Sequence, residues 1–345
     1  MKGRLLRLIP GLAISVGFMG WFVLNAHWAE VRSAMAGVKM EWVLLSAAVL
    51  FTEFAIRAAR WKVLLRPLAP KARFGRLFVA TVIGMSLNVV LPFRAGDFAR
   101  PWLGDRETGV GILPLATIAV IERVFDILGL VSVLLIMVAI LPADVEAHGE
   151  LVVNLQVYGG LLGTVGIGCL LVFLFLAARE NAARGVFARI VSIAPRPVAD
   201  RFLDLFDGFA GGFASIRSRR ALAEAGALSL VHWMNGAISI WVLFHAFDIA
   251  LPFAAACFTT VAIALAAALP QAPGFFGVFH KAIEMTLVLW GQPLGPSQAF
   301  AIVFWAVSFV PIATVGALLC WKEGVTPRQI REEMARAGAA EAAAK

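Results

Sequence analysis

Charged residues and cysteines are both scarce in this chain of 345 residues. Only 15% of the residues are charged whereas 61% are hydrophobic, and this balance excludes an ordinary soluble domain. The three cysteines, Cys169, Cys257 and Cys320, lie far apart in apolar stretches, so we expect neither a disulfide framework nor a metal site. The sequence has no Walker, Gly-x-Ser-x-Gly or Gly-x-Gly-x-x-Gly motif, which leaves no recognisable route to ATP hydrolysis. No cofactor is expected.

The positive charge that the chain does carry lies mostly between its apolar stretches. The positive-inside rule for membrane proteins explains the net charge of +8 better than a nucleic-acid partner does. Several stretches reach the roughly 20 apolar residues that a helix needs to cross a bilayer. The sequence therefore predicts an all-α polytopic protein of the bacterial cytoplasmic (inner) membrane.

Loop charges predict the topology. Residues 57–76 include seven basic residues and no acid, which places them in the cytoplasm, whereas residues 142–150 have three acids and no Lys or Arg, which places them outside. Both termini are expected in the cytoplasm, and the first apolar stretch is too long for the core of a signal peptide. Six full spans are expected, at residues 5–24, 42–56, 112–141, 151–177, 221–247 and 299–320.

The parity of these crossings predicts two re-entrant hairpins from opposite faces of the membrane. One full span separates the two charged loops, so residues 74–111 must enter and leave on the cytoplasmic side, with a break at Pro92. The same argument makes residues 248–298 a hairpin that enters from outside. Its two apolar limbs are residues 253–269 and 275–290.

The two breaks share a local signature. Leu91-Pro92 is followed by Gly96, and Leu269-Pro270 is followed by Gly274, 178 residues further on. Paired broken segments of opposite topology are typical of inverted-repeat transporters, and the alternative is two ordinary proline breaks. The expected organisation is a single membrane domain over residues 1–320, with a first half at 1–178, a cytoplasmic amphipathic connector at 179–220 and a second half at 221–320. Residues 321–345 are expected to form a cytoplasmic tail. The candidate break residues are Pro92, Gly96, Pro270, Pro273, Gly274 and Gly277.

Together, these motifs resemble the membrane domain of lysylphosphatidylglycerol synthases, which stand-alone flippase-like proteins share. The residues that carry the resemblance are Arg57, Arg60, Trp61, Leu64, Leu65, Asn88, Leu91, Pro92, Arg94, Gly96, Asp97, Arg100, Glu122, Arg123, Asp126, Leu269, Pro270, Pro273, Gly274 and Gly277. The resemblance covers nearly the whole chain and implies movement of a phospholipid between leaflets. The chain departs from the pattern at Asp97, where Glu is expected, and at His280, where an acid is common. Only about two dozen residues follow Trp321, so no synthase domain is expected.

Ionisable residues in apolar segments are the candidate site. Three charges in one span cost about 8–10 kcal/mol at roughly 2.5–3.5 kcal/mol each, so they need protein, water or a polar ligand around them. Arginine suits bidentate contact with phosphate, and the alternative is salt bridging among the residues themselves. The candidate substrate-binding residues are Arg94, Asp97, Arg100, Glu122, Arg123, Asp126, Asn88, Arg57 and Arg60.

Other polar residues of the spans have plainer interpretations. Glu53 and Arg57, four residues apart, are expected to form a local ion pair. His232 lacks the neighbours of a zinc site and suits a hydrogen bond between helices. His280 and Glu284 are candidates for proton coupling, or alternatively cap a hairpin limb.

Three functions follow as hypotheses. The first is translocation of an anionic phospholipid or a polyprenyl-phosphate-linked lipid, with the headgroup held by intramembrane arginines. The second is an integral membrane transferase that modifies lipid, with Asp97, Glu122 or Asp126 as its base. The third is a non-catalytic scaffold for a partner synthase.

Overall fold

The computed structural model describes residues 17, 19–91, 96–140, 164, 167–172, 174–175, 178–191, 196–268, 273–326 and 329. The regular structure within these residues is helical throughout, as predicted. Most of the expected fourth span, most of the first span, and Pro92, Arg94 and Pro270 lie outside the described residues.

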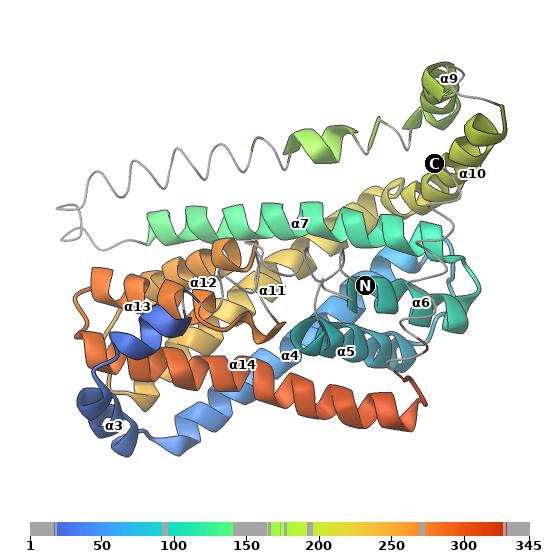
Figure 1. Ribbon diagram of the computed structural model, residues 1–345. Helices are drawn as coiled ribbons and strands as arrows, with labels where there is room; N and C mark the ends of the chain where they lie inside the picture. The colour runs from blue at the N-terminus through green and yellow to red at the C-terminus, as the bar shows by residue number, and fades with distance from the viewer. Residues whose placement is uncertain are drawn as a thin grey trace.

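Four long helices form the body of the protein (Figure 1). They are α4 (Met40–Leu65), α7 (Ile112–Ala139), α11 (Arg219–Ala246) and α14 (Leu294–Lys322). Each is about 40 Å long at 1.5 Å per residue, which exceeds the roughly 30 Å hydrocarbon core of a bilayer. By length and composition, α4, α11 and α14 are candidate membrane spans. The protein is therefore a multi-pass membrane protein.

Two pairs of shorter helices pack between the long ones. One pair is α5 (Phe74–Val90) with α6 (Gly96–Thr108), and the other is α12 (Phe253–Ala268) with α13 (Val278–Leu289). At about 18–26 Å, none is long enough to cross the hydrocarbon core. The pairs lie toward opposite ends of the molecule, α5 and α6 on the right of Figure 1 and α12 and α13 on the left.

Contacts between the long and short helices follow a matched pattern. Helices α4 and α11 pack against each other along much of their length. Near the start of α4, the hydroxyls of Ser46 and Ser239 each donate to the backbone carbonyl of the other residue at 2.9 and 3.0 Å. Helix α5 packs against α14, and α12 packs correspondingly against α7. Likewise α4 contacts α14, and α11 contacts α7.

Glycines allow the chain to turn and approach closely at both breaks. Gly274 and Gly277 adopt φ values of +79° and +81°, which confirms the prediction that no continuous helix passes through this point. Gly274 belongs to the short 3-10 helix η4 (Pro273–Phe275), which lies between α12 and α13 in the chain. At Gly96, a Cβ atom would lie 1.7 Å from the carbonyl oxygen of Gly84, so α5 and α6 approach each other only because this residue is glycine.

The predicted end of the second span is wrong. Helix α4 continues past Ile56 to Leu65, and Arg60 and Trp61 are only 1% and 2% exposed. These residues do not lie in a solvated cytoplasmic loop. The helix buries Arg60 because carboxylates from α7 neutralise its charge.

The connector contains α9 (Glu180–Val191), α10 (Arg196–Gly212) and the 3-10 helix η3 (Phe213–Ile216). The predicted helical apolar pattern divides between two environments. Phe213 is buried and Phe206 packs on the core beside α7, whereas Phe202 and Phe209 remain exposed. On the opposite side of the molecule, the short helix α3 (Trp28–Ala36) packs against α14.

Candidate functional site

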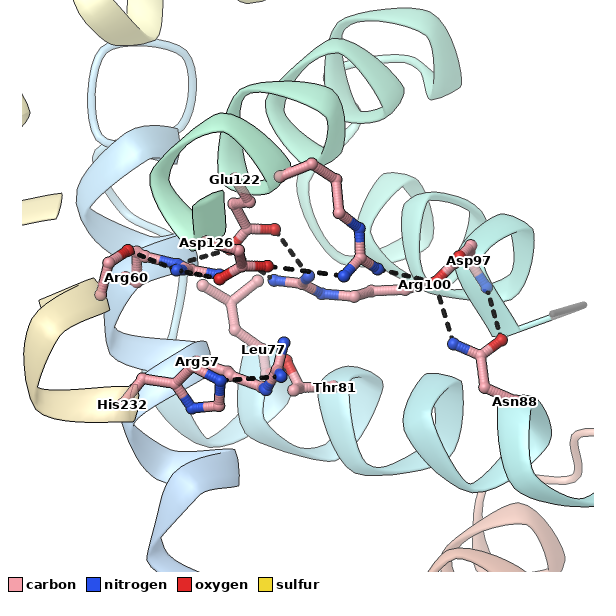
Figure 2. A network of polar contacts seen from close by, with 12 residues as sticks. Arg57, Arg60, Leu77, Thr81, Asn88, Asp97, Arg100, Glu122, Asp126 and His232 are labelled. Carbon is pink, nitrogen blue, oxygen red and sulfur yellow. Dashed lines mark hydrogen bonds and ion pairs between the residues drawn. The ribbon is translucent and has the colours of Figure 1, made fainter. Parts of the chain in front are cut away.

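Arg60 of α4 is the most deeply buried member of an ionic network between helices (Figure 2). Its guanidinium donates to Asp126 Oδ1 at 2.7 Å and to Ser229 Oγ of α11 at 2.5 Å. Its Nε also lies 3.5 Å from Glu122 Oε1. Arg60 therefore joins α4, α7 and α11 in the interior of the protein.

Arg100 of α6 meets the same carboxylate from the other side. Its two terminal nitrogens donate to the two oxygens of Glu122 at 2.6 and 3.1 Å, a bidentate arrangement. Its guanidinium also stacks on the Trp61 ring, 4.2 Å from the ring centre. The salt-bridge alternative is what the structure has here, and phosphate binding by Arg100 stays a prediction.

Asp97 and Arg123 extend the network toward solvent. Arg123 lies 3.2 Å from Asp97 and 3.4 Å from Asp126, and its side chain is 46% exposed. The Asn88 amide donates to Asp97 Oδ1 at 2.9 Å and accepts from the Asp97 backbone N–H at 3.2 Å, as drawn in Figure 2. These contacts tie α5, α6 and α7 together, whereas Arg94, the predicted partner of Asp97 and Arg100, lies outside the described residues.

The charges of this network cancel. Positive charges on Arg57, Arg60, Arg100 and Arg123 oppose negative charges on Glu53, Asp97, Glu122 and Asp126. Neutrality lowers the cost of placing ionised groups at membrane depth, because each charge has a partner close by.

A cavity of about 220 Å³ lies beside this network, between the two halves of the protein. Its polar side consists of Glu53 and Arg57 from α4 and His232 from α11. Its aromatic side consists of Phe279 from α13 with Phe304 and Phe309 from α14. Most of the remaining lining is aliphatic, so the cavity offers one charged region in an apolar surround.

Arg57 links two helices at the polar side of the cavity. Its Nε lies 3.4 Å from Glu53 Oε1, which confirms the expected local ion pair. Its Nη2 lies 2.9 Å from His232 Nε2 (Figure 2). The helix-packing hydrogen bond expected of His232 is thus present, but the sequence does not identify its partner, which lies 175 residues away. The only sequence signal for His232 as part of the site is its polar ring in an otherwise apolar segment.

His280 and Glu284 lie elsewhere, on α13. Glu284 accepts from Lys281 Nζ at 2.6 Å and from Gln298 Nε2 at 3.2 Å. His280 packs among aromatic rings, with Phe22 at 5.1 Å and Trp305 at 5.9 Å between ring centres. Neither residue lines the cavity beside Arg57, and proton coupling through them stays a prediction.

Comparison with known proteins places the chain in a family. The family model for the lysylphosphatidylglycerol synthase TM region matches residues 8–316. The glycosyltransferase AglD of Haloferax volcanii is 26% identical over 326 residues, which cover 86% of this chain but only 51% of that protein. A UPF0104 membrane protein of Methanothermobacter thermautotrophicus is 24% identical over 81% of this chain and 83% of its own length.

A second UPF0104 membrane protein, from Methanocaldococcus jannaschii, is 22% identical over 72% of this chain and 97% of its own length. No solved structure matches the chain. Because the family model covers most of the sequence, this chain belongs to the lysylphosphatidylglycerol synthase TM-region family.

Proposed function

We propose that the protein translocates an anionic phospholipid or a polyprenyl-phosphate-linked lipid between the leaflets of the cytoplasmic membrane. The observation that carries this proposal is the cavity between the two halves, with Glu53, Arg57 and His232 on one side and aromatic rings on the other. A lipid has the same division, because its phosphate needs charged donors and its chains need apolar surface. Arg57 supplies the cationic donor of the cavity.

The proposed topology is six full spans with two re-entrant hairpins, arranged as an inverted repeat with both termini in the cytoplasm. The shortness of α5, α6, α12 and α13 supports the hairpins, and the matched contacts of the two halves support the repeat. In single-cysteine variants, a membrane-impermeant thiol reagent applied from outside should label Glu146→Cys and leave Lys71→Cys unlabelled. The reverse labelling pattern would contradict the topology.

The second candidate is a transferase that acts on a lipid-linked glycan, and it rests on the name of the relative AglD. The proposed bases are poorly suited to take a proton, because arginines already engage Glu122, Asp126 and Asp97. The third candidate, a scaffold for a partner synthase, predicts neither translocation nor turnover.

Reconstitution into liposomes with a fluorescent anionic phospholipid separates the three candidates. If an added quencher reaches fluorescent lipid that began in the inner leaflet, and no new lipid species forms, the result supports translocation. A modified lipid supports the transferase. The absence of both results supports the scaffold. Arg57→Ala should slow translocation roughly ten- to a hundredfold, the equivalent of losing one charged hydrogen bond of about 1.5–3 kcal/mol. Arg184→Ala, in the exposed connector, is the matched control and should translocate lipid as the wild type does.

A further inference from the structure

The contact between Arg57 and His232 determines the protonation state of the imidazole. A guanidinium nitrogen can only donate, so at 2.9 Å His232 Nε2 must be the acceptor. The ring is therefore neutral and carries its proton on Nδ1. That Nδ1 atom is buried and has no hydrogen-bond partner among the described residues.

Burial and the positive charges around the ring both favour the neutral form of His232. Arg57, Arg60 and Glu53 face it from α4, and Asp126 and Arg123 face it from α7. The nearest of these charges is the Arg57 guanidinium, and a proton on Nε2 would set two positive groups against each other at 2.9 Å. Protonation of His232 and its contact with Arg57 therefore exclude one another.

We infer that an anion bound at Arg57 is accompanied by one proton on His232, so that the cavity takes up anion and proton together. This inference rests on the proposed function, with the phosphodiester of a lipid as the anion. A phosphate oxygen accepts the Nη2–H that His232 now accepts. The freed Nε2 lone pair then takes one proton from water, and the resulting imidazolium lies beside the phosphate.

Electrical neutrality of the site favours this exchange. The ionisable groups that the structure describes around the cavity sum to zero, so a bound phosphodiester alone would leave one uncompensated negative charge in an apolar site. One proton on His232 restores neutrality. The lipid would then cross as an electroneutral pair with a proton, and a proton gradient would set the direction of transport.

The test measures proton uptake on binding by the full-length protein in a neutral detergent. The probe is dioctanoyl phosphatidylglycerol, whose phosphodiester keeps a single fixed charge near neutral pH, so any proton taken up belongs to the protein. Calorimetry in buffers of different ionisation enthalpy should give about one proton per lipid near pH 7. The apparent Kd should fall as pH falls, by up to about tenfold per pH unit.

Two histidine variants on α11 locate the proton. His232→Gln keeps an acceptor for Arg57 but has no titratable nitrogen, so the lipid should bind with no proton uptake and little pH dependence. His245→Gln is the matched control, because His245 lies on the same helix, is exposed and does not line the cavity. Its proton uptake should equal that of the wild type.

The outcomes separate this inference from the proposed function. Binding by the wild type without proton uptake, or uptake that persists in His232→Gln, overturns the inference and leaves translocation standing. Absence of lipid binding overturns both. Equally tight, proton-coupled binding of dimethyl phosphate would overturn a lipid as the ligand. If His232→Gln does not fold, proton uptake and the pH dependence of Kd in the wild type decide the matter.

Discussion

The two halves of the protein share an arrangement of helices but differ in what lies inside it. In the first half, α6 of the short pair packs on α7, whose inner residues Glu122 and Asp126 are ionised partners of arginines. In the second half, α13 of the short pair packs on α14, which has no charged residue before Lys322. There Phe279 contacts Phe304 and Phe309 instead, with ring centres 5.9 and 5.1 Å apart.

The interior of the first half therefore depends on ion pairs with a fixed geometry, whereas that of the second half depends on aromatic packing, which is less directional. An ion pair fails when one partner is removed, because the remaining charge is buried alone, whereas aromatic rings can slide and repack with smaller losses. The first half is therefore suited to hold a fixed geometry around the polar side of the cavity.

The largest expected effect is in the ionic interior. Glu122→Ala leaves Arg60 and Arg100 without their shared carboxylate and should destabilise the fold by about 3–5 kcal/mol. The yield of monodisperse protein and the Tm in detergent measure this loss. The double variant Glu122→Gln with Arg100→Gln removes one charge of each sign and should recover part of it. If Glu122→Ala keeps the wild-type Tm but does not move lipid, Glu122 acts on the lipid and the contrast between the halves is wrong.

The next largest loss of stability is expected where α5 and α6 approach each other closely. Gly96→Ala places a methyl group against the Gly84 carbonyl and should cost about 1–3 kcal/mol as α5 and α6 separate. Gly75→Ala, on α5 but with no atom within 4 Å of its Cβ position, is the control and should leave the Tm unchanged or raised. Equal Tm values for the two variants would show that α5 and α6 have room to adjust.

A substitution at the helix break of the second half should affect the rate of lipid transport more than it affects stability. Gly274→Ala forces a left-handed backbone on alanine, at a cost of about 1–2 kcal/mol. Gly291→Ala imposes the same kind of strain at φ +80°, away from the break and with no atom near its Cβ position. Gly274→Ala should lose somewhat more stability, because its Cβ would lie 2.7 Å from the Phe276 ring, and only Gly274→Ala should slow lipid movement in liposomes. Similar transport rates in both would exclude a role for the break in movement.

The smallest expected effect is in the exposed connector. The hydrogen bond from the Arg184 guanidinium holds the pKa of Asp207 below its usual range. A lowered pKa in the folded state gives stability that is complete above the usual value of about 3.9 and is lost as pH falls through the lowered value. The hydrogen-exchange protection of α9, measured relative to the intrinsic exchange rate at each pH, should therefore fall in acid. Asp207→Asn should remove this pH dependence, and unchanged acid sensitivity in that variant would assign the effect to another group.

Local signals predicted most of the elements that build the cavity. The limb expected at residues 74–91 is α5 at Phe74–Val90, and the limb expected at 253–269 is α12 at Phe253–Ala268. These bounds follow from apolar stretches that end at proline and glycine, and such residues act on the backbone at their own position. The left-handed Gly274 and Gly277 were predictable for the same reason.

The sequence by itself determined that the chain is a helical membrane protein, that its helices break near Gly96 and Gly274, and which residues bring charge into the apolar segments. Apart from the local pair Glu53–Arg57, only the tertiary structure decided which of those charges meet. Arg60 pairs with Asp126, 66 residues away in the chain, and Arg57 contacts His232, 175 residues away. The predicted end of α4 was wrong for the same reason. A basic stretch is assigned to a loop when the carboxylates that neutralise it are not known. Helix formation depends on near neighbours, whereas ion pairing depends on which faces of distant helices pack together.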